Sequence, residues 1–151
     1  MAANIFDQAD YQNIISRIEA LEEIHAKNWG KMNIVQMLQH CAIQLKLGLG
    51  IIPHAGPEGS AIMRTGLGRW LTLYAIPWPK GLPTPSKMNM VDNEYSVHDF
   101  ETEKKSLLVL LEEVQRNPNL HPHPFFGAMN ATDWGRLIWK HLAHYLRQFG
   151  G

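Results

Sequence analysis

Apolar side chains recur every three to four residues in five segments of the chain, and this spacing is typical of helices that bury one face. The segments cover residues 10–25, 33–49, 60–76, 99–117 and 130–150. The sequence contains no convincing pair of strand segments, no internal repeat and no linker between domains. The pattern therefore predicts an all-α fold in one domain that spans residues 1–151.

Residues with strong positional preferences mark the ends of several segments. Asn33, Asp99 and Asn130 stand at the starts of the second, fourth and fifth segments, where a short polar side chain caps the first helical turn. Asp133 follows Asn130 by three residues, which approximates a capping box with a shorter acid than the usual Glu. Two glycines weaken the helical pattern of the third segment.

Two long, proline-rich connections separate the helical segments. Residues 117–129 contain three prolines, and residues 77–98 contain Pro77, Pro79, Pro83 and Pro85. Connections of this length in a small helical domain often cover a site or cross over the other helices. The simplest architecture is an antiparallel four-helix bundle with an extra short helix and long crossover loops.

Composition excludes several classes of function. The chain has 14 Lys and Arg and 14 Asp and Glu, so no global field favours nucleic acid or an anionic membrane. No apolar stretch is long enough to span a bilayer, and the N-terminal residues do not have the pattern of a signal peptide. Cys41 is the single cysteine, which excludes an intrachain disulfide. We therefore expect a cytoplasmic protein that binds neither nucleic acid nor a membrane.

Candidate chemistry is concentrated in the last predicted helix. His141 and Gln148 lie at one edge of its apolar face, Tyr145 lies near the middle, and His144 lies at the border of the polar side. We expect His141 to be at least half buried and His144 to be exposed. Burial of histidine requires a partner, and a metal ion is one such partner. A further ligand would then come from His40 in the second helix, whereas the alternative is a set of purely structural histidines.

Other residues have both a functional and a structural interpretation. His123, in the loop before the last helix, either offers a polar group to a cleft or belongs to a turn that Pro124 shapes. Gln148 is a better candidate than Arg147 for a hydrogen bond that orients His141. Trp70 and Trp134 are expected to fill the core.

Three segments resemble an uncharacterised family of the DinB-like (YfiT-like) superfamily, namely QMLQHCA, HPFFG and DWGRLIWKHLAHYLRQFG. The resemblance covers most of the chain. It implies a four-helix bundle of up-down-down-up topology that is often a homodimer. It also implies a divalent metal, Zn or Ni, held by one histidine of the second helix and two of the last helix. Some members of the superfamily are thiol-dependent transferases or hydrolases.

The resemblance places His40 and His141 at two of the three ligand positions, and Tyr145 at the third. His144 matches a neighbouring histidine that is normally not a ligand. Three alternatives follow: His144 completes the site, Tyr145 binds weakly or through a water, or the site holds no metal.

Two functions are therefore expected for this chain. The first is a metal-dependent hydrolase or thiol-dependent transferase of an unknown small molecule. Its ligands would be His40, His141 and His144, surrounded by Tyr145, Gln148 and His123. The alternative is a metal-free ligand-binding or dimerisation module with the same fold.

Overall fold

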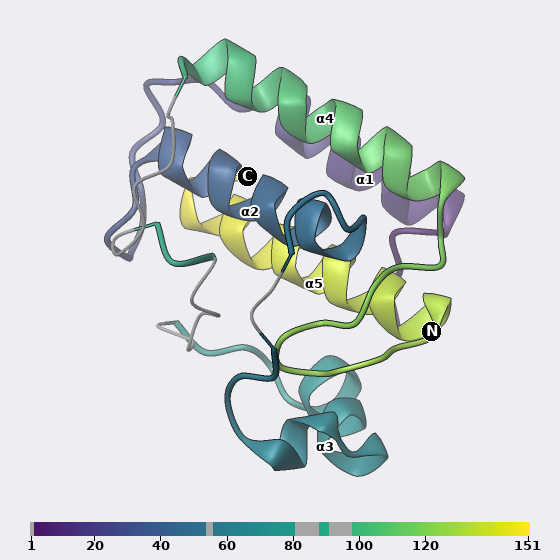
Figure 1. The fold of residues 1–151 in the computed structure, drawn as a ribbon. Coiled ribbons are helices and arrows are strands. Elements are labelled where there is room, and N and C mark those ends of the chain that lie inside the picture. The colour runs from purple at the N-terminus through teal and green to yellow at the C-terminus, as the bar shows by residue number, and fades with distance from the viewer. Residues whose placement is uncertain (1, 54–55, 81–87, 91–97) are drawn as a thin grey trace.

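The structure, a computed structural model, describes residues 2–53, 56–80, 88–90 and 98–151, and within these ranges it is all-helical (Figure 1). This confirms the expected all-α class for the described residues. The long helices are α1 (Gln8–Glu19), α2 (Ile34–Gly48), α4 (Phe100–Arg116) and α5 (Ala131–Gln148). None of the described helices is long and apolar enough to cross a membrane.

Three short helical pieces follow one another between α2 and α4. They are the 3-10 helix η1 (Ala61–Arg64), the helix α3 (Gly66–Trp70) and the π-helix η2 (Leu71–Ala75). Together, residues 60–76 form a lobe that lies to one side of the four long helices (Figure 1).

Each long helix packs against two of the others. α1 runs parallel to α5: the N–H of Ile5, just before α1, donates to the carbonyl of Gly135 in the first turns of α5, and Arg17 near the end of α1 donates to the carbonyl of Ala143. α1 runs antiparallel to α4, because Lys104 near the start of α4 donates to the carbonyl of Glu19 at the end of α1. α2 lies against α4 and α5, and Figure 1 shows the same directions.

The periodic apolar positions of the sequence meet in one core between these helices. Burial of this apolar surface is the main force that holds the four helices together. The fully buried side chains include Ile14, Ile18, Leu38, Leu45, Leu107, Leu111, Val114, Trp134 and Ile138. Trp134 therefore fills the core as expected, whereas Trp70 is 54% exposed and the expectation for it was wrong.

The predicted helix starts are confirmed. Asn33 and Asp99 cap α2 and α4, and Asn33 forms a full capping box with the side chain of Gln36. Asn130 caps α5 by accepting from the N–H of Asp133. The carboxylate of Asp133 is used elsewhere, since it accepts from the side chains of Arg69 and Tyr74 in the lobe.

The first helix is shorter than predicted, ending at Glu19 instead of residue 25. The ammonium group of Lys104 donates to the carbonyls of Glu19 and Leu21, so α4 satisfies acceptors that further helical turns would have used. Leu21 then turns into the core, where only 2% of its surface is exposed.

The single helix predicted over residues 60–76 is divided into three pieces. Thr65 separates the first two, because its hydroxyl donates to the carbonyl of Ile62 and accepts from the N–H of Gly68. A Cβ atom on Gly68 would lie 1.9 Å from the Ile62 carbonyl oxygen, so this tight turn requires glycine. The apolar period of this segment consequently does not produce one buried face, and Ile62 and Leu67 are exposed.

The two proline-rich connections are described to different extents. Residues 117–129 run past the end of α2, where the N–H of His121 donates to the carbonyl of Gly48, and lead into α5 without a helix of their own. Pro83 and Pro85 of the other connection lie outside the described residues, so the expectation of a long crossover there is not tested.

Asn33→Ala should destabilise the protein by about 1 kcal/mol, because it removes the acceptor that caps the first turn of α2. Urea unfolding at neutral pH would measure the loss. Asn13→Ala is a matched control, since Asn13 is exposed inside α1, where alanine is neutral or slightly favourable. Equal stability of the two variants would contradict a capping role for Asn33.

Candidate functional site

Two pairs of polar residues face each other across the contact between α2 and α5. His40 and Gln44 lie one turn apart on α2, and His141 and Tyr145 lie one turn apart on α5, so each pair shares a helix face. All four residues line a cavity of about 260 Å³. Because α2 and α5 belong to different ends of the sequence, the site exists only once the chain is folded.

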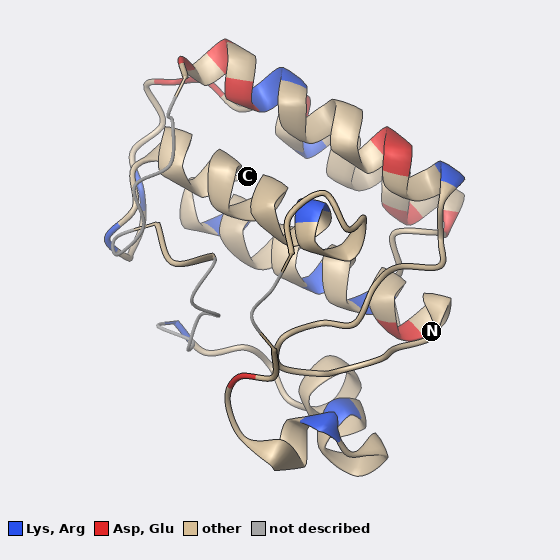
Figure 2. Ribbon diagram, in the orientation of Figure 1, with Lys and Arg blue, Asp and Glu red and all other residues tan. Residues whose placement is uncertain are grey.

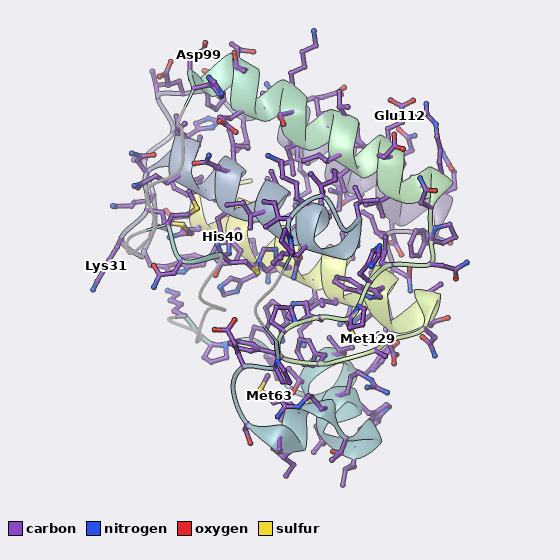
Figure 3. The ribbon with its side chains drawn as sticks, viewed as in Figure 1. Lys31, His40, Met63, Asp99, Glu112 and Met129 are labelled. Atoms are coloured by element: carbon purple, nitrogen blue, oxygen red, sulfur yellow. The ribbon has the colours of Figure 1, made fainter. Side chains whose placement is uncertain are left out.

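The lobe, the residues on either side of it and the connection over residues 117–129 form the other walls of the cavity. Figure 3 shows His40 on the side of α2 toward the lobe, from which Met63 comes. The large apolar lining residues are Met63, Trp78, Met88, Phe125, Phe126 and Leu137. No Lys, Arg, Asp or Glu occurs among the described lining residues. Charged residues are also rare on α2, whose one charged residue lies in its last turn (Figure 2).

His40 and His141 are in direct contact through their Nε2 atoms, which lie 3.0 Å apart. The Nδ1 atom of His40 lies 2.7 Å from the carbonyl oxygen of Met88. A carbonyl only accepts hydrogen bonds, so His40 carries its proton on Nδ1 and has a lone pair on Nε2. The facing Nε2 of His141 must then carry a proton, because two lone pairs at this distance would repel unless a cation lay between them.

This arrangement leaves one nitrogen of the pair without a partner. His141 Nδ1 is buried and has no hydrogen-bond partner among the described residues. An unpartnered buried polar group costs about 1–3 kcal/mol. The side-chain oxygen of Gln44 is a second such acceptor. The cavity lining thus includes two residues with unused hydrogen-bonding capacity.

Burial keeps both imidazoles neutral. Desolvation lowers the pKa of His40 from 6.5 to about 4, although the Met88 carbonyl opposes this effect. The pKa of His141 is held well below 6.5, first by desolvation and then by the nearby imidazoles of His40, His144 and His123. Neutral imidazoles can accept a proton or a hydrogen bond, and they can ligate a metal.

Tyr145 packs against both histidines. Its ring centroid is 4.5 Å from that of His40 and 4.8 Å from that of His141. His144 is 4% exposed, so the expectation that it would be exposed was wrong. Its ring packs edge-on against Trp29 and Trp78. A wheel of one helix cannot show this, because both tryptophans come from other segments.

The described residues fit a divalent metal only in part. Two imidazole nitrogens converge, and the Met88 carbonyl orients His40 as an outer partner commonly orients a metal ligand. However, His141 lacks such a partner, and the described ranges contain no group of three His, Cys, Asp or Glu placed to hold an ion. The ligand set of His40, His141 and His144 therefore stays a prediction.

Of the two remaining candidate residues, His123 lines the cavity and Gln148 does not. His123 lines the cavity, and its Nδ1 accepts from the N–H groups of Phe125 and Phe126, which fixes the turn as well. Gln148 is buried, but its amide donates to the carbonyl of Trp29. Gln148 thus holds the loop before α2 against the end of α5 and does not line the cavity.

Lys140 anchors the lobe beside the cavity, a role that the sequence analysis missed. Its ammonium group donates to the carbonyls of Thr72 and Ile76 at 2.8 and 2.6 Å, at the end of the π-helix η2. Desolvation, followed by repulsion from Arg136, lowers its pKa to about 8. A lysine near the apolar stripe of a predicted helix was the one available signal, and its partners could not be named because they are backbone groups.

The fold and the cavity together define a helical protein with a pocket whose described lining carries no charged side chain. A family model described as "Protein of unknown function (DUF1569)" matches residues 5–150. The match spans nearly the whole chain, so the protein belongs to the DUF1569 family. No curated protein and no solved structure matches the chain.

Acidification should destabilise the protein because the folded-state pKa values of His40 and His141 are depressed. The unfolded chain binds more protons below pH 6.5, so stability present at neutral pH is lost as the pH falls toward about 4. Urea unfolding at about pH 7 and about pH 5, with a chelator present, would measure the loss.

Variants assign this pH dependence to the buried pair. His141→Gln should reduce the loss of stability between the two pH values, whereas His98→Gln, at an exposed position, should leave it unchanged. The assignment is wrong if both variants retain the full pH dependence of the natural sequence.

Proposed function

We propose that this protein binds a small molecule in the cavity between α2, α5 and the lobe. The observation that carries the proposal is the buried His40–His141 pair, which lines this cavity and leaves the Nδ1 atom of His141 without a partner. A buried polar group of this kind gains a hydrogen-bond partner when a ligand, a water or an ion occupies the space beside it. Apolar walls with a few convergent polar groups are typical of ligand sites.

The proposal includes the DinB-like relationship that the three sequence segments suggest. The four long helices would form the up-down-down-up bundle, and the lobe would be the extra short element. The parallel pair of α1 and α5 and the antiparallel pair of α1 and α4 support this topology. A cytoplasmic location is part of the same proposal, supported by the single cysteine.

A divalent metal on the same histidine pair is the second candidate. The 3.0 Å separation of the two Nε2 atoms supports it, because two imidazoles on one zinc ion at about 2.0–2.1 Å lie at a similar spacing. Zn or Ni held there would act as a Lewis acid or lower the pKa of a bound water or thiol. These are the chemistries of the hydrolase and thiol-dependent transferase activities that the resemblance implies.

A homodimer is also proposed, and the lobe supplies a surface that supports it. Ile62, Leu67 and Trp70 are all more than half exposed on the lobe. Contact between two copies through these side chains would remove apolar surface from water.

Filling the cavity should abolish binding of small probes. We expect a fragment mixture of varied charge, screened by ligand-observed NMR, to contain binders that are lost in Met63→Trp because the indole occupies the cavity. Val109→Trp adds the same side chain at an exposed site on α4 and should keep all binders. Fragments that bind Met63→Trp as well as they bind the natural sequence would refute the proposed site.

Metal binding is tested on protein without a histidine tag. With only two imidazoles, we expect Ni²⁺ or Zn²⁺ to bind weakly and to raise the melting temperature slightly, and His40→Gln should remove the effect. Tyr145→His restores a third imidazole one turn after His141 and should strengthen binding by roughly tenfold or more.

His144→Gln decides between the remaining alternatives for the third ligand. A loss of metal affinity in this variant would favour His144, whereas unchanged affinity would favour Tyr145 or water. If neither metal changes the melting temperature of the natural sequence or of Tyr145→His, the metal candidate is excluded and the small-molecule proposal remains.

A further inference from the structure

The chemistry of the cavity points to a class of ligand. We propose that the ligand is an uncharged aromatic molecule of one or two rings that carries a hydrogen-bond donor. This inference rests on the proposed function, since it specifies what the cavity between α2, α5 and the lobe binds.

Charge is the first constraint. The described lining residues contain no Lys, Arg, Asp or Glu. The nearest buried ammonium group, that of Lys140, is already shared among the backbone carbonyls of the lobe. The carboxylate of Asp133 is likewise occupied, by Arg69 and Tyr74. Against this described lining, a charged ligand would lose hydration without gaining a counter-ion, which is unfavourable.

Size and shape are the second constraint. A cavity of about 260 Å³ corresponds to roughly nine water volumes at about 30 Å³ each, which suits one or two rings. The indole of Trp78 and the rings of Phe125, Phe126 and Tyr145 contribute to the lining. Met63 and Met88 add thioether sulfurs, which contact aromatic edges favourably. Flat ring surfaces and adaptable thioethers favour an aromatic ligand over a branched aliphatic one.

Hydrogen-bonding capacity is the third constraint. His40 is satisfied on both nitrogens, by Met88 and His141. Gln44 Oε1 and His141 Nδ1 are the buried acceptors of the lining that lack a partner among the described residues. Both require a donor, so a ligand N–H or O–H would relieve the cost of leaving one unpaired. A ligand with acceptors alone would not.

Four probes that share a p-tolyl ring and differ in one polar substituent test these constraints. They are p-cresol, p-methylanisole, p-toluate and p-methylbenzylammonium, titrated at neutral pH and followed by protein NMR shifts. We expect p-cresol to bind at least about tenfold more tightly than either ion, because the described lining residues offer neither ion a counter-charge. We expect p-methylanisole, which has no donor, to bind roughly threefold to tenfold more weakly than p-cresol.

Variants connect these preferences to the site. Met63→Trp should abolish p-cresol binding, and Val109→Trp should preserve it. Gln44→Leu should reduce the preference for p-cresol over p-methylanisole, whereas Gln12→Leu on the exposed face of α1 should not. An unchanged preference in Gln44→Leu would overturn the role of Gln44 as the acceptor for the ligand.

The outcomes separate this inference from the proposed function. Binding of p-toluate or p-methylbenzylammonium as tight as that of p-cresol, and lost in Met63→Trp, would overturn the uncharged class while the cavity remains the binding site. Failure of all four probes would overturn the inference. The proposed function would fall only if the mixed fragments also failed to distinguish Met63→Trp from the natural sequence.

Discussion

The contact between His40 and His141 is the interaction on which the rest of the site depends. Two Nε2 atoms 3.0 Å apart require a proton or a cation between them, so this contact fixes the protonation of both rings. The Met88 carbonyl determines which ring donates in this contact. Because this carbonyl holds the proton of His40 on Nδ1, His40 Nε2 accepts and His141 Nε2 donates. A short chain of hydrogen bonds thus runs from a loop through α2 to α5. In a water-poor interior such a chain is stronger than its separate members would be in water.

The lobe supplies part of the wall of the cavity that these two histidines line. The lobe lies to one side of the four long helices, and polar side chains of α5 hold it there. Lys140 binds the carbonyls at the end of η2, and Asp133 binds Arg69 and Tyr74. A π-helix is uncommon, and its occurrence beside a buried polar pair is consistent with a functional site. The described lining of the cavity consists largely of rings and thioethers and includes no charged side chain.

Much of the scaffold follows from local sequence rules. Asn33, Asp99 and Asn130 each cap the helix they were expected to cap, and the apolar stripes of the long helices are buried. The lobe did not follow from the same rules. Its apolar period is that of a helix, but the hydrogen bonds of Thr65 and the close approach at Gly68 divide it. Periodicity shows which side chains could share a helix face, whereas these contacts determine whether the backbone continues as one helix.

For the site, the sequence by itself determined the residue types and their spacing on each helix. His40 and His141 were recognisable because a histidine in an apolar stripe needs a partner, and Tyr145 was recognisable as a departure from the pattern that the DinB-like resemblance implies. Only the tertiary structure decided the partners. Met88, the environment of His144 and the anchoring by Lys140 depend on groups distant in sequence, most of them backbone carbonyls. Backbone carbonyls are the same in every residue, so their positions become specific only when the chain is folded.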